Sequence, residues 1–142
     1  MATAVSYGTP ARARTPCQPL TCRLEFRATA GAVPCARSLA RRIIVEWGWP
    51  DLADVAELLV SELVTNAIHA SAALPAPLVR LWLVAGNDTI VIRVWDASVH
   101  MPRRRNVDPE SEHGRGLMLV ESLSKQWGAS RKPSGKVVWA QI

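Results

Sequence analysis

Residues 57–71 form the most regular stretch of this 142-residue sequence, and they predict a helix with a wide apolar face. Apolar residues recur there at the three- and four-residue spacing of an α-helix. They are Leu58, Leu59, Leu63, Val64, Ala67 and Ile68. Within this pattern stand Glu62 and Asn66, four positions apart and so on one face, one above the other. The general preference of such groups for exposure favours two solvated residues over a base and a metal ligand facing a pocket.

Length and composition describe a globular chain with one core. The sequence has 142 residues, 49% of them hydrophobic and 20% charged, which is typical of a single folded domain. No apolar run approaches the roughly 20 residues needed to span a bilayer, and we expect no signal peptide at the N-terminus. The cysteines, Cys17, Cys22 and Cys35, lack CxxC spacing, which favours free thiols. These features predict a cytoplasmic protein that does not associate with membranes.

The basic charge raises the question of nucleic-acid binding. The formal charge is +5 and the pI is about 9.7. In the sequence, however, the tryptophans stand mostly beside apolar residues and do not interleave with the basic ones, and no helix-turn-helix, finger or RNA-binding motif is present. A small polyanion or an acidic partner protein fits this charge as well, so we expect no direct contact with nucleic acid.

Patterning predicts a strand and two helices in the N-terminal half. Residues 1–19, rich in Pro, Ser, Thr and Arg, predict a flexible tail, and the folded domain is expected over residues 20–142. Residues 21–29 alternate between apolar and polar, as in a half-buried strand. The first helix follows residues 31–34 and ends at residues 48–50. Its predicted buried face is Leu39, Ile43, Ile44 and Trp47, and its solvated face is Arg37, Arg41 and Arg42.

The second helix and the C-terminal half follow from turn signals. Asp51 and Asp54 predict an N-cap and a capping-box residue at the start of the second helix. Two strands, residues 78–85 and 89–95, are predicted on either side of a hairpin turn at residues 86–88. A third helix is expected over residues 117–127, and a closing hairpin pairs residues 129–132 with residues 137–142.

The predicted elements are grouped rather than strictly alternating, which bears on the fold class. A strand, two helices, a hairpin, a helix and a second hairpin favour an α+β two-layer sandwich. In this arrangement about three helices cover one face of a mixed sheet. The long aperiodic segment, residues 97–115, is expected to be a lid, because structureless loops of that length in compact domains are usually functional.

Two further segments place polar groups or glycines in an apolar setting. Asp96 directly follows a predicted strand, and Gly114 and Gly116 stand at the start of the third helix. Each alone has an ordinary reading, a turn former or a tight turn. Backbone N–H groups at a helix start, however, can bind an anion such as a phosphate chain. One amide oxygen is a sufficient protein ligand for Mg²⁺, and a glutamate one turn away can take a proton.

Taken together, the segments VSELVTNAIHAS, VWDAS, HGRGLMLVESLSKQWG and GKVVWAQI resemble the GHKL, or Bergerat, ATP-binding fold. Gyrase, the heat-shock chaperone, histidine kinases and mismatch-repair ATPases share that fold. Within it, the sequence most resembles the small bacterial anti-sigma-factor serine kinases and related regulatory ATP-binding proteins. Three boxes in the family's order make this resemblance more specific than any one of them.

The resemblance assigns roles residue by residue. It implies that Glu62 is the catalytic base, that Asn66 holds Mg²⁺, and that Asp96 binds the adenine amine of ATP. It also implies that Ser98, Gly114, Arg115, Gly116 and Leu117 bind the nucleotide, with Ser98 replacing the first glycine of a box whose second glycine is His100 here. The family often carries a Thr for adenine on the last strand, and Val137 stands near that position.

The resemblance therefore implies an ATP- and Mg²⁺-dependent serine/threonine kinase that regulates transcription. Its protein partner would be of the anti-anti-sigma type, a sigma factor, or both, and a homodimer is compatible with the family. The altered glycine box and Val137 leave a second reading open, in which ATP is a regulatory ligand without turnover and the protein acts by contact alone.

Overall fold

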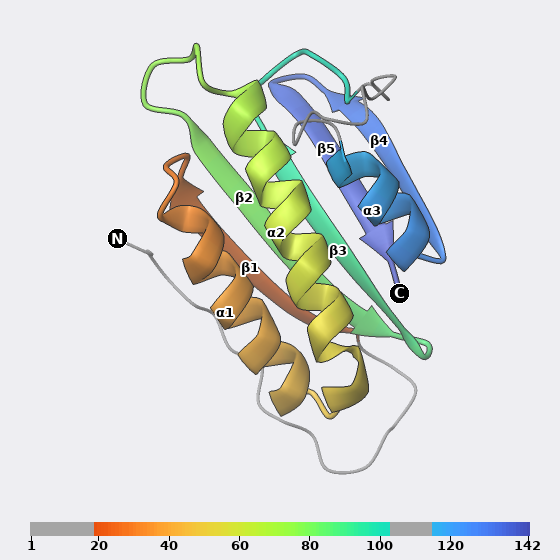
Figure 1. Ribbon diagram of the computed structural model, residues 1–142. Helices are drawn as coiled ribbons and strands as arrows, with labels where there is room; N and C mark the ends of the chain where they lie inside the picture. The colour runs from red at the N-terminus through yellow and green to blue at the C-terminus, as the bar shows by residue number, and fades with distance from the viewer. Residues whose placement is uncertain (1–18, 103–114) are drawn as a thin grey trace.

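The computed structural model describes residues 19–102 and 115–142, and within them it forms two layers (Figure 1). Five strands form one sheet, and three helices lie on one of its faces. In chain order the elements are β1 (Leu20–Arg27), α1 (Ala32–Glu46), a short 3-10 helix η1 (Pro50–Leu52), α2 (Ala53–Ala70), β2 (Leu78–Gly86), β3 (Thr89–Asp96), α3 (Arg115–Leu123), β4 (Gln126–Lys132) and β5 (Gly135–Gln141). The predicted α+β two-layer sandwich is confirmed. Of the predicted tail, residues 1–18 lie outside the described residues.

The order of the strands across the sheet is β1-β2-β3-β5-β4, and every neighbouring pair in these residues is antiparallel. The prediction of a mixed sheet is therefore wrong. The reason is the closing hairpin, which folds back so that its second strand, β5, lies beside β3. This leaves β4 at the edge, where it has no parallel neighbour.

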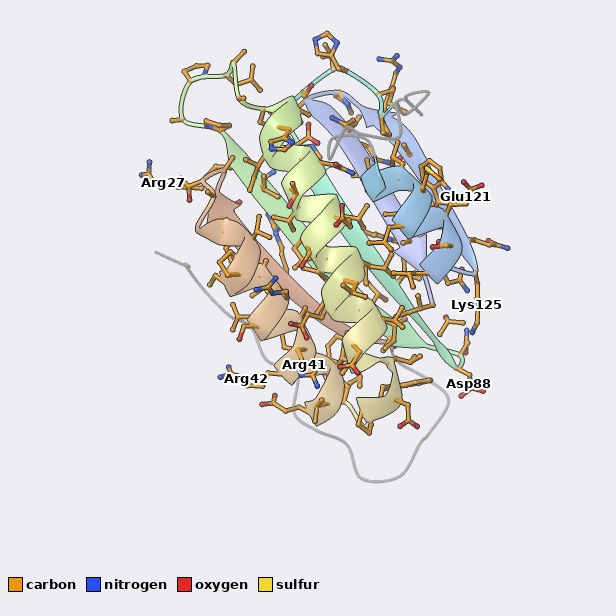
Figure 2. The ribbon with its side chains drawn as sticks, in the orientation of Figure 1. Arg27, Arg41, Arg42, Asp88, Glu121 and Lys125 are labelled. Carbon is orange, nitrogen blue, oxygen red and sulfur yellow. The ribbon has the colours of Figure 1, made fainter. Side chains whose placement is uncertain are left out.

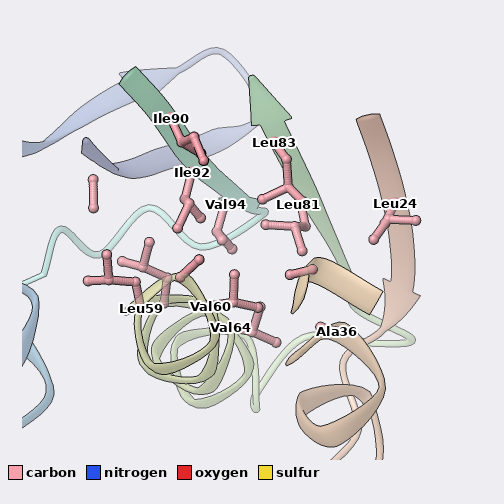
Figure 3. Close-up of a cluster of buried hydrophobic side chains, with 14 of the residues drawn as sticks. Leu24, Ala36, Leu59, Val60, Val64, Leu81, Leu83, Ile90, Ile92 and Val94 are labelled. Carbon is pink, nitrogen blue, oxygen red and sulfur yellow. The ribbon is translucent and has the colours of Figure 1, made fainter. Parts of the chain in front are cut away.

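The core lies between the sheet and α2 (Figure 3). Strand alternation turns every second residue toward the helices, and the innermost side chains from β2 and β3 are fully buried. They are Val79, Leu81, Leu83, Ile90, Ile92 and Val94, and α2 meets them with Leu59, Val60, Leu63 and Val64. Leu58, predicted on this apolar face, is instead 47% exposed. It lies about half a helical turn from the buried stripe, because successive residues rotate by about 100°.

The start of α2 differs from the prediction. Neither Asp51 nor Asp54 caps the helix, because η1 runs directly into α2 and no side-chain cap hydrogen bond forms. Leu52, at the N-cap, has helical angles (φ −95°, ψ −4°) rather than the extended ones of a capping residue. Asp54 instead forms an ion pair with Arg41 of α1, near the adjoining ends of the two helices (Figure 2).

The arginines of α1 are exposed, as predicted, and some of them also tie α1 to α2. Arg41 lies 2.9 Å from Glu57, and Arg37 lies 3.5 Å from the same carboxylate. Hydrogen bonds to Asp54 and Glu57 raise the pKa of Arg41 above its usual value. Since such pairs are solvated, they orient the two helices more than they stabilise the fold.

Helix α3 is shorter than predicted. It ends at Leu123, and Trp127, expected in its last turn, lies in β4 opposite Ala140. Pairing with β5 buries part of the indole against the core, and this tertiary contact overrides the local helical pattern.

The face of the sheet opposite the helices carries the arginines and tryptophans that do not alternate in the sequence. Across the strands, Arg23 pairs with Trp82, Trp82 with Arg93, and Arg93 with Trp139. The Arg80 guanidinium stands 4.6 Å from the centre of the Trp95 ring. The expectation that basic and aromatic residues do not interleave is therefore wrong on this face, because strand pairing brings distant segments together.

Two of the three cysteines lie among the described residues. Cys22 and Cys35 are free, as predicted, and Cys17 lies outside the described residues. Burial raises the pKa of the Cys22 thiol. Among the helices that the structure describes, none is both long and apolar enough to cross a membrane.

Candidate functional site

A cavity of about 300 Å³ opens between α2, the end of β3, the first half of β5 and the start of α3. Its walls include most of the predicted site residues that the structure describes. They are Glu62, Asn66, Asp96, Gly116 and Leu117, joined by His69, His100 and Lys136. Residues distant in the sequence thus meet at one end of the sheet, where the resemblance placed a nucleotide.

Glu62 and Asn66 reach this cavity from the flank of α2. The buried stripe of the helix packs on the sheet, and these two residues stand beside that stripe, half-buried, on the side of α3. The apolar residues around Glu62 and Asn66 in the sequence therefore form the helix face that packs on the sheet. The side chains face neither the core nor open solvent, but a cavity between two helices.

Gly116 brings the first turn of α3 close to both of these side chains. A Cβ added at Gly116 would lie 2.6 Å from Oε2 of Glu62 and 3.4 Å from Oδ1 of Asn66. Only a glycine therefore leaves the carboxylate in place. The short distance also puts backbone groups at the start of a helix beside the two oxygens, an arrangement suited to a phosphate with a cation.

Asp96 places a buried carboxylate at the base of the cavity. It follows the inward-facing Val94 by two residues in β3, so alternation turns it toward the helices, and it is 1% exposed. Its Oδ1 accepts two hydrogen bonds of 2.8 Å, one from the backbone N–H of Ser98 and one from Nζ of Lys136.

Lys136 lines the cavity but was not predicted from the sequence as a site residue. It lies opposite Asp96 in the β3–β5 ladder, is 3% exposed, and lines the cavity. Val137, which we placed near this position, pairs with Trp95 and faces the other side of the sheet. The signal was the alternation itself, because Lys136 shares its parity with the buried Val138 and Ala140.

Ser98 and His100 shape the chain that leaves β3. Ser98 is 3% exposed and does not line the cavity, but its N–H holds Asp96 and its Oγ accepts a hydrogen bond of 3.1 Å from the His100 backbone. Ser98 thus positions the carboxylate instead of contacting the cavity. Of the predicted lid, residues 97–102 and Arg115 are described, while Gly114 and residues 103–113 lie outside the described residues.

The oxygen donors of the cavity suit a magnesium ion that is carried by a nucleotide. Mg²⁺ prefers oxygen ligands and keeps most of its waters, and Asn66 and Glu62 offer an amide oxygen and a carboxylate on adjacent turns. In the described part of the chain, no group of three or more His, Cys, Asp or Glu residues could hold a metal by itself. A cation here would therefore need ligands from phosphate and water.

Comparisons with known proteins identify the fold and the family of this chain. The crystal structure of the RsbU and RsbW domains of Rv1364c from Mycobacterium tuberculosis is similar to this fold, with a TM-score of 0.62 and 21% sequence identity. The match covers 90% of this chain and 33% of that one, so this chain spans about a third of its length. No curated protein matches the sequence. The family described as histidine kinase-like ATPase domain matches residues 26–142, and the chain belongs to that ATPase family.

Proposed function

We propose that this protein binds ATP with Mg²⁺ in the cavity and transfers the terminal phosphoryl group to a serine or threonine of a partner protein. The observation that carries the proposal is the burial of Asp96 in the lining of a cavity that Glu62, Asn66 and Gly116 also line. A buried carboxylate acceptor and a helix start with oxygen ligands nearby supply the kinds of group that the base and the phosphates of a nucleotide need.

The base of the nucleotide belongs at Asp96. A buried carboxylate accepts hydrogen bonds only, and the exocyclic amine of adenine is a donor of the right kind. The apolar side chains nearby, Val94 and Val138, line the same cavity and would contact the faces or edges of a planar base.

The phosphates belong near the first turn of α3. The first turn of a helix has N–H groups without intrahelical partners and a partial positive charge, which favour an anion, and Gly116 permits a close approach to Glu62 and Asn66. Asn66 would hold Mg²⁺ through its amide oxygen, and the ion when bound neutralises charge on the phosphates. Leu117, which also lines the cavity, would close it from the side of α3.

Glu62 would serve as the general base, which takes up a proton. The partner's hydroxyl oxygen bonds to the γ-phosphorus, the bond from that phosphorus to the bridging oxygen breaks, and ADP leaves. The hydroxyl proton passes to the Glu62 carboxylate. Positioning and charge stabilisation supply most of the catalysis in such transfers.

Two measurements test this proposal. ATP with Mg²⁺ should raise the Tm, since a ligand selective for the folded state must do so. Incubation with ATP and captured partner proteins, followed by mass spectrometry, should reveal a phosphoserine or phosphothreonine. Glu62→Gln should keep ATP binding and lose about 100-fold or more in transfer, whereas Asn66→Ala and Asp96→Asn should weaken binding itself.

Glu57→Gln is the matched control, because Glu57 lies on the same helix, outside the cavity, and pairs with Arg41. It should change neither binding nor transfer. An unchanged Tm at millimolar ATP would refute nucleotide binding altogether.

The partner proposed from the resemblance is an anti-anti-sigma-type protein, with a sigma factor as the target it controls. In this proposal the protein works in the cytoplasm, without direct nucleic-acid contact, and a homodimer is compatible with the role. The partner's hydroxyl would enter where α3 meets α2, beside Glu62.

A second function, ATP binding without turnover, is favoured by the structure of the altered glycine box. Ser98 is engaged by its own side chain and backbone in holding Asp96 and His100. The chain leaving β3 is therefore built differently from a run of glycines. In this case ATP would raise the Tm of the wild type, no partner would be phosphorylated, and Glu62→Gln would have no effect on partner binding.

A further inference from the structure

Lys136 has more hydrogen-bonding capacity than its described contacts use. A lysine ammonium carries three donors and is rarely buried unless it is paired. The Lys136 side chain is 4% exposed, and one donor reaches Oδ1 of Asp96 at 2.8 Å. Among the residues that the structure describes, no other hydrogen bond of this ammonium is found, while the side chain lines the cavity.

The Asp96 carboxylate has a free hydrogen-bond acceptor beside the free donors of Lys136. Both hydrogen bonds that the described residues make to this carboxylate, from Ser98 and from Lys136, end on Oδ1. Oδ2 is thus left as an acceptor on a residue that lines the cavity. The two side chains together present an acceptor and a donor next to each other, and their charges cancel, so the base of the cavity suits a neutral ligand.

We propose that Lys136 is a specificity-determining residue that donates a hydrogen bond to ring nitrogen N1 of adenine while Oδ2 of Asp96 accepts from the 6-amino group. This inference rests on the proposed binding of ATP. On adenine the 6-amino donor and the N1 acceptor are neighbours, which matches the free acceptor of Asp96 beside a free donor of Lys136. Adenine therefore leaves no polar group of this edge unpaired.

The same pair discriminates against guanine. Its edge presents one acceptor, O6, followed by two donors, N1–H and the 2-amino group. In the pose proposed for adenine, guanine O6 would face Oδ2 of Asp96, acceptor against acceptor, and N1–H would face Nζ of Lys136, donor against donor. A buried donor without a partner costs binding free energy, and sites of this kind reject such analogues strongly.

A purely structural role for Lys136, balancing the charge of Asp96, would not involve N1. The discriminating probe is 1-deaza-ATP, in which a C–H group replaces N1 and the 6-amino group is kept. Calorimetry with the intact protein and Mg²⁺ should show that wild type binds ATP about tenfold or more tightly than 1-deaza-ATP, the loss expected for one hydrogen bond to a charged group.

Lys136→Met should bind the two nucleotides with nearly equal affinity, because the donor that tells them apart is gone. Lys125→Met is the matched control, since Lys125 is exposed beyond the C-terminal end of α3 (Figure 2) and should keep the tenfold preference. If Lys136→Met fails to fold, equal affinity of wild type for the two nucleotides would still overturn the inference.

Equal affinity of wild type for ATP and 1-deaza-ATP would overturn the inference and leave ATP binding intact. A preference that survives in Lys136→Met would overturn it too, since another group would then read N1. Absence of any ATP binding would overturn this inference together with the proposed function.

Discussion

Gly116 sets how closely α3 approaches the carboxylate of Glu62. The contact is local, and the side chain that would have to move is the end of a flexible one. A methyl group at this position therefore tests whether the location of that carboxylate matters for function rather than for folding.

We expect Gly116→Ala to weaken MgATP binding or phosphotransfer about tenfold or more while leaving the Tm unchanged or higher. Alanine is favoured over glycine in helices by up to about 1 kcal/mol, whereas the new Cβ would displace Oε2 of Glu62, 2.6 Å away. Calorimetry and thermal unfolding measure the two effects separately. Gly31→Ala is the control, because its Cβ would have no neighbour nearer than 4.0 Å.

Single residues show how far the site could be predicted. Glu62 and Asn66 could be expected on one face because helical spacing fixes which residues lie together, and Asp96 could be expected at a strand end because it follows a clear alternation. Their roles in binding stay predictions. Lys136 was missed because lysine is normally exposed, and one position of error in a strand exchanges the two faces of a sheet. Nothing in the local sequence reports that β5 lies next to β3.

The β2–β3 hairpin has a backbone that side chains tolerate poorly. Its turn residues, Asn87 and Asp88, have φ angles of 51° and 60°, the left-handed values of a type I′ turn. Asp88 lies at the tip of the hairpin (Figure 2). Glycine is the residue that enters this conformation without steric cost.

Asp88→Gly should be more stable than Asp88→Ala by about 1 kcal/mol in urea unfolding. Both variants lose the same carboxylate, so the comparison isolates the backbone. The matched pair Asp51→Gly and Asp51→Ala, in η1 where φ is not positive, should show the opposite order. A glycine variant at position 88 no more stable than the alanine variant would contradict the assigned turn.

The elements also differ in how well the sequence predicts them. The β2–β3 hairpin follows from strong turn residues between alternating strands. The end of α3 does not, because the apolar spacing continues through Trp127 and only pairing with β5 turns that residue into a strand. Likewise, α2 lacks the predicted cap because Pro50 starts a 3-10 turn ahead of it.

Across the whole sheet, protection from solvent should follow strand order rather than chain order. Edge strands leave half of their backbone groups without a strand partner, and local opening begins where such contacts are few. We expect amide hydrogen exchange to be slowest in β2, β3 and β5 and faster in β1 and β4, as measured by NMR or mass spectrometry. Exchange in β5 as fast as in β4 would contradict the central position of β5.

The grouping of elements sufficed to predict a two-layer molecule, but it did not predict which residues meet on the face of the sheet opposite the helices. Arg23, Trp82, Arg93 and Trp139 stand in one row only because four strands align them. Pairing of this kind is a property of the assembled sheet, so no stretch of sequence contains it. The antiparallel order of all neighbouring strands is hidden for the same reason.

The insertion of β5 between β3 and β4 also matters while the chain is being made. Synthesis proceeds from the N-terminus, so Glu62, Asn66 and Asp96 leave the ribosome well before Lys136, and the ammonium that balances Asp96 is supplied by the final element of the described order. Until that strand arrives, Asp96 lacks the Lys136 ammonium, and the position between β3 and β4 in the sheet is empty. A nascent chain therefore cannot complete the cavity early, because Lys136 and Val138 in its lining belong to the last strand of the described order.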